Sequence, residues 1–215
     1  MSLLLVDLDD TLIDRTAAVR AWLEGFIGDV GAPISDVDYL LDIDAGARGL
    51  AVEFARTLQE RYGLGRPIED IAEDIRAGVL DGIELTPADR QALEAVRAAG
   101  WSTVVVTNGG VASQERKIRS SGIDQLVDGW IVSAAVDVWK PDPLIFELAA
   151  KRAGRPLADA WMIGDNPEAD IAGAHNAGIS SVWLHHGRPW PDLPYRPTRS
   201  ADSCADAIRS VLADG

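Results

Sequence analysis

Cysteine and histidine are nearly absent from this sequence. Its 215 residues include one cysteine, Cys204, and three histidines. A lone cysteine excludes an intrachain disulfide and a cysteine-based zinc site. Because disulfides belong mainly to oxidising compartments, this composition fits a cytoplasmic protein.

Positively charged residues are also fewer than negatively charged ones. Lysine and arginine number 20 against 34 aspartates and glutamates, which gives a formal net charge of −14. A chain this acidic repels nucleic-acid phosphates and anionic lipid headgroups, and no basic run offers a local exception. We therefore expect no nucleic acid and no membrane among its partners.

Long apolar runs and several well-known motifs are missing too. No stretch approaches the roughly 18 residues of a membrane-spanning helix, and no basic segment precedes the first apolar run. The chain has neither a G-x-x-x-x-G-K-[ST] loop nor a G-x-S-x-G elbow. Their absence argues against nucleotide-driven motors and serine hydrolases. Together with the lack of a spanning segment, the sequence favours a cytoplasmic protein.

What the sequence does contain is the alternation of an α/β fold. Hydrophobic residues make up 47% of the chain and charged residues 25%, as in ordinary globular proteins. Near-continuous apolar runs of strand length, typical of parallel strands buried on both faces, occur at 3–6, 103–106, 130–132, 161–163 and 181–184. Helical patterns follow most of them. We predict a doubly wound, Rossmann-like parallel sheet.

One long segment interrupts that alternation. Apolar residues keep helical spacing at 19–27, 50–58 and 68–75. The spacing predicts an all-helical insertion at 15–85, placed after the first strand of a Rossmann-like core made of 1–14 and 86–215. Near the end, the proline-rich stretch 185–198 predicts an irregular surface loop, with His185 and His186 as surface residues, and 200–212 predicts a final helix.

Three aspartates, Asp7, Asp9 and Asp10, follow the first predicted strand in the stretch VDLDDTL at positions 6–12. Like charges this close raise one another's pKa unless something positive shares the site. In an extended segment Asp7 and Asp9 point the same way, whereas Asp10 has the opposite phase and is expected to cap a turn or face solvent. The Asp7 and Asp9 pair therefore predicts a site that needs a cation.

Three more polar clusters follow predicted strand ends: Thr107-Asn108-Gly109, Lys140-Pro141 and the segment 164–170. Because ligands bind at the carboxyl ends of parallel strands, these distant clusters can converge. In order and context the four clusters resemble the haloacid dehalogenase superfamily of hydrolases, mostly phosphatases, whose pattern is D-x-D-x-T, Ser/Thr, Lys and G-D-x-x-x-x-D. The stretches TNGG…QERKIRSSGI and KPDPLIFELA are similar to that superfamily beyond the motifs.

The resemblance implies that the two acids of the first motif share the chemistry. Asp7 would be the nucleophile that forms a transient aspartyl phosphate, since a carboxylate can split phosphoryl transfer into two displacements. Asp9 would protonate the leaving oxygen and then activate water, and its backbone carbonyl would bind the metal. A purely structural reading, with Asp7 as a strand-end cap, stays open.

The same resemblance assigns the remaining motif residues. Thr107 and Asn108 would hold the phosphoryl oxygens, and Lys140 would neutralise the nucleophile and the phosphate. Asp165 would bind the metal directly, together with the nucleophile, and Asp170 would act through water or by orienting other groups. Hard oxygen ligands of this kind suit Mg²⁺. The alternatives are a turn shaped only by its backbone, a surface lysine and a first-turn helix acid.

These roles together predict a Mg²⁺-dependent phosphatase that acts on a small-molecule phosphate ester. The resemblance also implies that the insertion 15–85 is a cap domain on the catalytic core, a lid that excludes water. A 2-haloacid dehalogenase is the first alternative, but the family's dehalogenases lack an acid at the position of Asp9. A phosphomutase would keep the same residues. A non-catalytic binding module would be expected to have lost at least one of them, and none is missing.

The substrate is the least determined feature. The segment 44–49 falls between two predicted cap helices and resembles in position the family's specificity loop. We expect Arg48 to contact an anionic or polar leaving group, with an ordinary surface arginine as the alternative. Phosphoglycolate, sugar phosphates, nucleoside monophosphates and amino-acid phosphates all fit, and the sequence does not indicate an oligomeric state.

Overall fold

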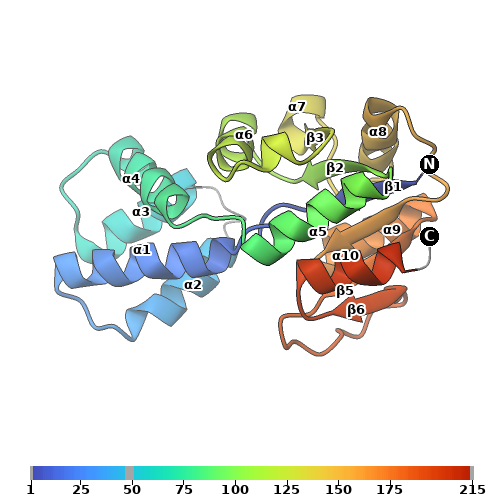
Figure 1. The fold of residues 1–215 in the computed structure, drawn as a ribbon. Helices are drawn as coiled ribbons and strands as arrows, with labels where there is room; N and C mark the ends of the chain where they lie inside the picture. The colour runs from blue at the N-terminus through green and yellow to red at the C-terminus, as the bar shows by residue number, and fades with distance from the viewer. Residues whose placement is uncertain (1, 47–50, 214–215) are drawn as a thin grey trace. The chain divides into compact units, whose positions relative to one another are not determined.

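The structure, a computed structural model, describes residues 2–46 and 51–213. The chain divides into two compact units. One unit, Met1–Ile13 with Glu84–Gly215, contains the strands and is called the sheet unit. The other, Asp14–Ile83, is built from helices and is called the helical unit (Figure 1).

The sheet unit is organised around a six-stranded parallel sheet. Its strands are β1 Leu3–Val6, β2 Ser102–Thr107, β3 Gly129–Val132, β4 Trp161–Gly164, β5 Ser180–Leu184 and β6 Arg199–Ala201. They lie in the order β3-β2-β1-β4-β5-β6, so β1 is a central strand paired with β2 and β4. The predicted α/β fold with a parallel sheet is confirmed, and the carboxyl ends of all six strands lie along one edge.

Helices pack against this sheet because its strands are apolar on both sides. They are α5 Pro87–Ala98, α6 Val111–Ser120, α7 Ser133–Val136, α8 Leu144–Ala153, α9 Ala172–Ala177 and α10 Cys204–Leu212, with short turns at Ile123–Gln125 and Pro167–Ile171. Leu3 and Leu5 join a hydrophobic cluster with Phe146 of α8. Leu4 and Val6 point to the opposite face and are equally buried.

The C-terminal segment departs from the prediction of one helix over 200–212. Residues Arg199–Ala201 form β6, which extends the sheet beside β5, and α10 starts only at Cys204. The helix starts there because the Ser203 hydroxyl accepts a hydrogen bond from the Asp206 backbone N–H at 3.1 Å and caps the first turn. A three-residue edge strand is too short to show a hydrophobic period.

The helical unit consists of α1 Arg15–Val30, α2 Asp36–Gly46, α3 Ala51–Tyr62 and α4 Ile68–Asp81. Its buried core joins α1, α3 and α4 through side chains at the predicted helical spacing: Val19, Leu23, Ile27, Phe54, Leu58, Ile71 and Ile75. Asp14 caps α1 by accepting a hydrogen bond from the Ala17 N–H at 2.8 Å. The Trp22 indole packs over Gly78, where any β-carbon would overlap it.

The segment expected to be a loop at 44–49 is partly helical. Asp44 to Gly46 are the last residues of α2, a helix that the sequence pattern did not predict because acidic residues interrupt its apolar positions. Asp44 is buried and accepts two hydrogen bonds from the Arg15 guanidinium, at 2.6 and 2.9 Å. Arg48 lies outside the described residues.

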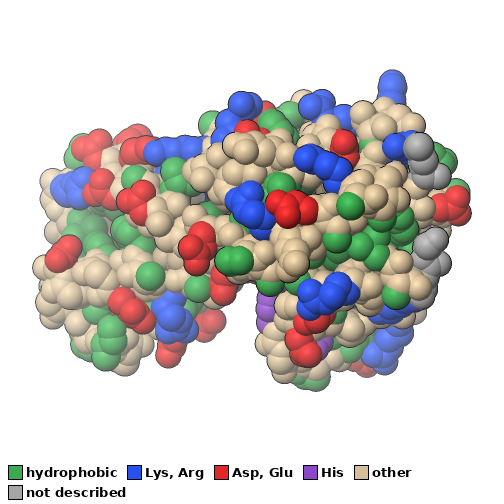
Figure 2. All heavy atoms as spheres, viewed as in Figure 1, with side chains coloured by type: hydrophobic (Ala, Val, Ile, Leu, Met, Phe, Trp, Pro, Cys, Tyr) green, Lys and Arg blue, Asp and Glu red, His purple; other side chains and the backbone are tan. Residues whose placement is uncertain are grey.

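The surface of the described residues agrees with the absence of long apolar runs. No helix within 2–46 and 51–213 is long and apolar enough to cross a membrane. Figure 2 shows acidic, basic and apolar side chains interspersed on the viewed face.

Candidate active site

The polar clusters meet at the carboxyl ends of β1, β2 and β4, in the middle of the sheet. Asp7 follows β1, Thr107 ends β2, and Asp165 follows β4. The Asp7 backbone N–H still donates to the Ile163 carbonyl at 2.9 Å, so the first acid is held by the sheet itself. Neighbouring parallel strands therefore bring together residues that are up to about 160 positions apart in the chain.

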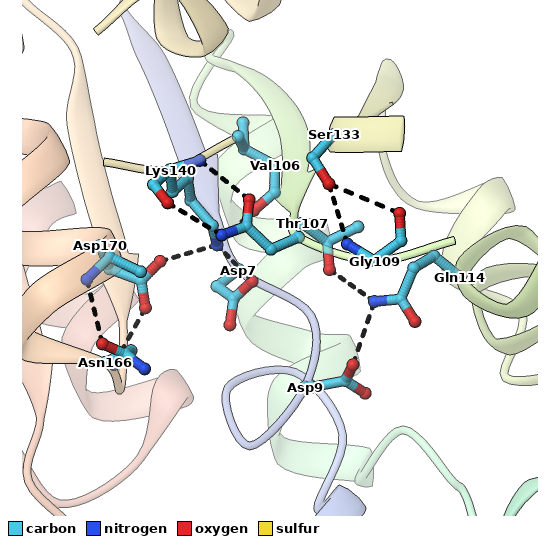
Figure 3. Close-up of polar contacts among 12 residues, drawn as sticks. Asp7, Asp9, Val106, Thr107, Gly109, Gln114, Ser133, Lys140, Asn166 and Asp170 are labelled. Carbon is cyan, nitrogen blue, oxygen red and sulfur yellow. Dashed lines mark hydrogen bonds and ion pairs between the residues drawn. The ribbon is translucent and has the colours of Figure 1, made fainter. Parts of the chain in front are cut away.

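Lys140 is the positive group at the centre of this site. Its Nζ lies 2.6 Å from Asp7 Oδ1 and 2.7 Å from Asp170 Oδ1, and it donates to the Val106 carbonyl at 2.8 Å (Figure 3). Its side chain is only 3% exposed, so Lys140 is not a solvated surface lysine. The ammonium group is committed to two carboxylates and one carbonyl.

Asn108 fixes the backbone of this lysine. Its side-chain Oδ1 accepts a hydrogen bond from the Lys140 N–H at 2.9 Å, and its Nδ2 donates to the Lys140 carbonyl at 3.0 Å. The structure therefore gives the Asn108 side chain a scaffolding contact, so only its backbone amide fits the predicted phosphate contact. The following residue, Gly109, donates its N–H to Ser133 Oγ at 2.9 Å.

Burial dominates the electrostatics of the acids. It raises the pKa of Asp7 well above its usual range, although the charge of Lys140 opposes the shift and those of Asp170 and Asp165 add to it. Burial, then the charges of Asp170 and Asp10, raise the pKa of Asp165 to about 7, with Arg188 opposing them. Three acids thus share too little positive charge.

The pKa of Lys140 is raised in spite of its burial. Burial alone lowers the pKa of a lysine, but here the carboxylates of Asp170 and Asp7 outweigh it and raise the pKa of Lys140. The lysine therefore stays charged, and it still leaves an excess of negative charge on the three acids.

The acids fit a divalent metal ion. One carboxylate oxygen each of Asp7, Asp165 and Asp170 lie within 4.8 Å of one another. Asp170 is fully buried and is oriented by the Asn166 N–H, which donates to its Oδ2 at 3.0 Å. Gly164 leaves room for the carboxyl group of Asp170, because a β-carbon there would overlap it. Three hard oxygen donors with surplus negative charge suit Mg²⁺.

Asp9 points to a different set of partners. Its Oδ1 lies 2.7 Å from Lys117 Nζ, and its Oδ2 accepts a hydrogen bond from Gln114 Nε2 at 3.0 Å. The same Gln114 nitrogen donates to Thr107 Oγ1 at 2.6 Å (Figure 3). The Asp9 carboxylate is thus outside the three-acid cluster, and Thr107 and Asp9 are tied together through α6.

A family model described as haloacid dehalogenase-like hydrolase matches residues 1–178. The chain belongs to this family. The expected resemblance is therefore confirmed, and with it the assignment of the chain as a hydrolase.

Individual relatives of this hydrolase include both phosphatases and dehalogenases. Phosphoserine phosphatase from Thermus thermophilus is 26% identical over 99% of this chain and 98% of its own length. The (S)-2-haloacid dehalogenase from Pseudomonas fluorescens is 30% identical over 58% of this chain and 56% of its own length. A magnesium-bound structure of YfnB from Bacillus subtilis, described as a HAD-hydrolase, shares the fold with a TM-score of 0.79 at 22% identity, over 98% of each chain.

The haloacid dehalogenase-like site contains residues that the sequence analysis missed. Gln114 and Lys117 are polar, yet they lie with Ile118 on the buried face of α6. A lysine at an inward-facing helical position was the available signal. It was overlooked because charged helix residues are usually solvated.

The proline-rich loop contributes a further contact. Arg188 Nη2 donates to the Asp165 carbonyl at 2.9 Å and to its Oδ2 at 3.1 Å. His186 Nε2 lies 2.7 Å from the Asp10 carbonyl. Asp10 adopts a left-handed backbone conformation with φ of 57°, and its charge acts on Asp165. The expectation that Asp10 only caps a turn or faces solvent is therefore incomplete.

Proposed function

We propose that this hydrolase is a Mg²⁺-dependent phosphatase that cleaves a small-molecule phosphomonoester through an aspartyl phosphate on Asp7. The observation that carries the proposal is the ion pair of 2.6 Å between Asp7 and buried Lys140, inside a cluster of three acids. A nucleophilic carboxylate needs positive charge to accept a phosphate dianion beside it. The site supplies one such charge and the ligands for a second.

In the first half-reaction an Asp7 oxygen would bond to phosphorus while the bond from phosphorus to the leaving oxygen breaks. Asp9 would give its proton to that oxygen, so that a neutral alcohol leaves. Thr107 Oγ and the Asn108 backbone amide would bind the phosphoryl oxygens, and Lys140 would offset their charge. Mg²⁺ held by Asp7, Asp165, Asp170 and the Asp9 carbonyl would add charge stabilisation when bound.

In the second half-reaction water would attack the aspartyl phosphate. Asp9, now a carboxylate, would take a proton from that water, and inorganic phosphate would leave with Asp7 restored. One residue thereby serves as acid and then as base, which leaves the enzyme unchanged after each turnover.

Asp9 favours phosphate hydrolysis over dehalogenation. A departing halide takes no proton, so a dehalogenase has no use for a proton donor at this position. Here the Asp9 carboxylate is held by two buried polar side chains, Lys117 and Gln114. A phosphomutase would keep the same residues, whereas a binding module would be expected to have lost at least one of them; the test below separates both from a phosphatase.

The remaining parts of the proposal concern the substrate side. The predicted insertion 15–85 would act as a cap, a proposal that the compact helical unit Asp14–Ile83 supports. Arg48 would contact the leaving group. The acidic composition and the small phosphorylated substrates named for the relatives support a cytoplasmic enzyme of metabolism, with an amino-acid phosphate such as phosphoserine first among the candidates.

The test is a phosphate-release screen of phosphorylated metabolites with Mg²⁺, beginning with phosphoserine. Asp7→Asn is the blank, because an amide cannot act as the nucleophile, and Lys151→Met on the exposed side of α8 is the matched control. The proposal predicts turnover in the wild type and the control and none in Asp7→Asn. Full turnover by Asp7→Asn, halide release without Mg²⁺, or transfer without net phosphate release would each overturn it.

A further inference from the structure

Lys117 is a buried lysine outside the three-acid cluster. Its Nζ lies 2.7 and 2.8 Å from the two carboxylate oxygens of Asp9 and donates to Gln114 Oε1 at 2.9 Å. These contacts supply a partner for each of the three ammonium protons. A buried charge is tolerated only when it is paired in this way, so the position of Lys117 is coupled to that of Asp9.

Asp9 needs such support because the sheet does not hold it. β1 ends at Val6, and the chain then turns, with the N–H groups of Leu12 and Ile13 both donating to the Leu8 carbonyl. Asp9 lies inside this turn, and its side chain is 25% exposed. Side-chain contacts therefore have a large share in fixing the direction of its carboxylate.

Gln114 connects this carboxylate to the predicted phosphate contact. Its Nε2 donates to Asp9 Oδ2 at 3.0 Å and to Thr107 Oγ1 at 2.6 Å, while its Oε1 accepts from Lys117. Both N–H donors of this buried amide and one acceptor position of its oxygen are thus used. Gly109 makes room for it, because a β-carbon there would lie 3.0 Å from Gln114 Cγ and Cδ.

We propose that Lys117 and Gln114 are positioning residues that hold the Asp9 carboxylate in a fixed place relative to Thr107, so that the proton reaches the leaving oxygen. The inference rests on the proposed function. A buried ion pair is poor evidence for stability, since apolar residues of similar volume often stabilise a protein as well or better. Orientation of the Asp9 carboxylate therefore explains the contacts of Lys117 and Gln114 better than a contribution to protein stability does.

The test uses the dependence of the rate on the leaving group. p-Nitrophenolate leaves readily without a proton, whereas phenolate and the serine alkoxide of phosphoserine are poor leaving groups unless they are protonated. We expect Lys117→Met and Gln114→Met to lower kcat/KM for phenyl phosphate at least about tenfold more than for p-nitrophenyl phosphate, a fraction of what general acid catalysis contributes. Lys117→Arg keeps the charge and is expected to recover most of the loss.

Asp9→Asn separates this inference from the proposed function. If Asp9→Asn shows the leaving-group effect but Lys117→Met and Gln114→Met lower both rates equally, the inference is wrong and the phosphatase mechanism stands. If Asp9→Asn itself lowers both rates equally, the acid role of Asp9 is wrong. The double variant Asp9→Asn with Lys117→Met is expected to match Asp9→Asn alone, because Lys117 acts through Asp9.

Folding is controlled independently of the rates. Each variant is compared with Lys151→Met in thermal unfolding, and a cooperative transition is required before its rates are interpreted. Gln114→Met, which removes no charge, carries the test if Lys117→Met does not fold. An unchanged leaving-group dependence in folded Gln114→Met would then overturn the proposal.

Discussion

Arg188 places its guanidinium against Asp165, 2.9 Å from the carbonyl oxygen and 3.1 Å from Oδ2. A fixed cation therefore touches one of the three acids proposed to bind Mg²⁺. The Arg188 guanidinium and a bound Mg²⁺ would both contact the Asp165 carboxylate and repel each other. The arginine is therefore expected to weaken the binding of the metal.

Removal of that charge is predicted to tighten Mg²⁺ binding. Arg188→Gln keeps a hydrogen-bond donor but no charge, and because the Arg188 side chain is 48% exposed the effect is modest. We expect the dissociation constant to fall about two- to fivefold, as for a partly solvated ion pair. Titration calorimetry with MgCl₂ measures it, and Arg196→Gln, an exposed arginine of the same loop, is the control. Weaker binding in Arg188→Gln would show that the arginine supports the site instead.

Metal binding is predicted to stabilise the fold. At a free Mg²⁺ concentration of about 100 times the dissociation constant, binding adds about 2.7 kcal/mol to the free energy of unfolding. For a chain of this size that raises Tm by roughly 5–10 °C. Asp170→Asn is expected to lose most of this increase, whereas Asp159→Asn, an exposed acid, keeps it. Equal increases in the two variants would argue against a metal ligand at Asp170.

The metal-free protein is predicted to lose stability as the pH rises towards neutrality. Burial raises the pKa of Asp165 from 3.8 to about 7. Between these values the folded state holds a proton that the unfolded state has released, so the free energy of unfolding falls with rising pH. The loss for this group amounts to at most about 4 kcal/mol. Denaturant unfolding in EDTA at several pH values measures it.

Two controls identify the cause of that slope. Asp165→Asn removes the titrating group and is expected to flatten the dependence on pH. Mg²⁺ binds the ionised carboxylates, so saturating metal is expected to reverse the trend and to bind more tightly above about pH 7 than below it. A slope that is identical in wild type and Asp165→Asn would assign it to other groups.

Gly164→Ala is predicted to damage the site although no charged residue is replaced. The added methyl group would overlap the carboxyl group of Asp170, a fully buried side chain that cannot swing into solvent. We expect a loss of about 1–3 kcal/mol of stability, as for overpacking in a core, together with weaker Mg²⁺ binding. Gly28→Ala in α1 is the matched control, because nothing lies within 4 Å of its added carbon. A loss of the same size in both would exclude the overlap as its cause.

The central strands could be predicted from sequence because they are apolar on both faces. Leu3–Val6 and 103–106 contain no polar interruption except Thr103 and lie in the middle of the sheet. β6 could not be predicted, since an edge strand of three residues, none of them buried, has no hydrophobic pattern of its own. α2 was missed because its buried acid, Asp44, is compensated by Arg15, a residue 29 positions away.

The candidate site shows the same limit. Asp7 and Asp165 follow strand ends and Thr107 ends β2, so the parallel topology alone is enough to predict that these three meet, whereas Lys140 comes from the segment after α7. Lys117 is different, because a lysine in an amphipathic helix is usually solvated. The contact between Lys117 and Asp9 can be recognised only from the structure, in which α6 lies beside the turn after β1.

The central place of β1 also divides the first motif into two residues of unequal mobility. The Asp7 N–H is part of the hydrogen-bond ladder to β4, so it can exchange with solvent only when the middle of the sheet opens. The Asp9 N–H belongs to a turn, where opening needs far less free energy. Only Leu8 therefore separates a backbone amide that exchanges through opening of the sheet from one that exchanges through local opening of a turn.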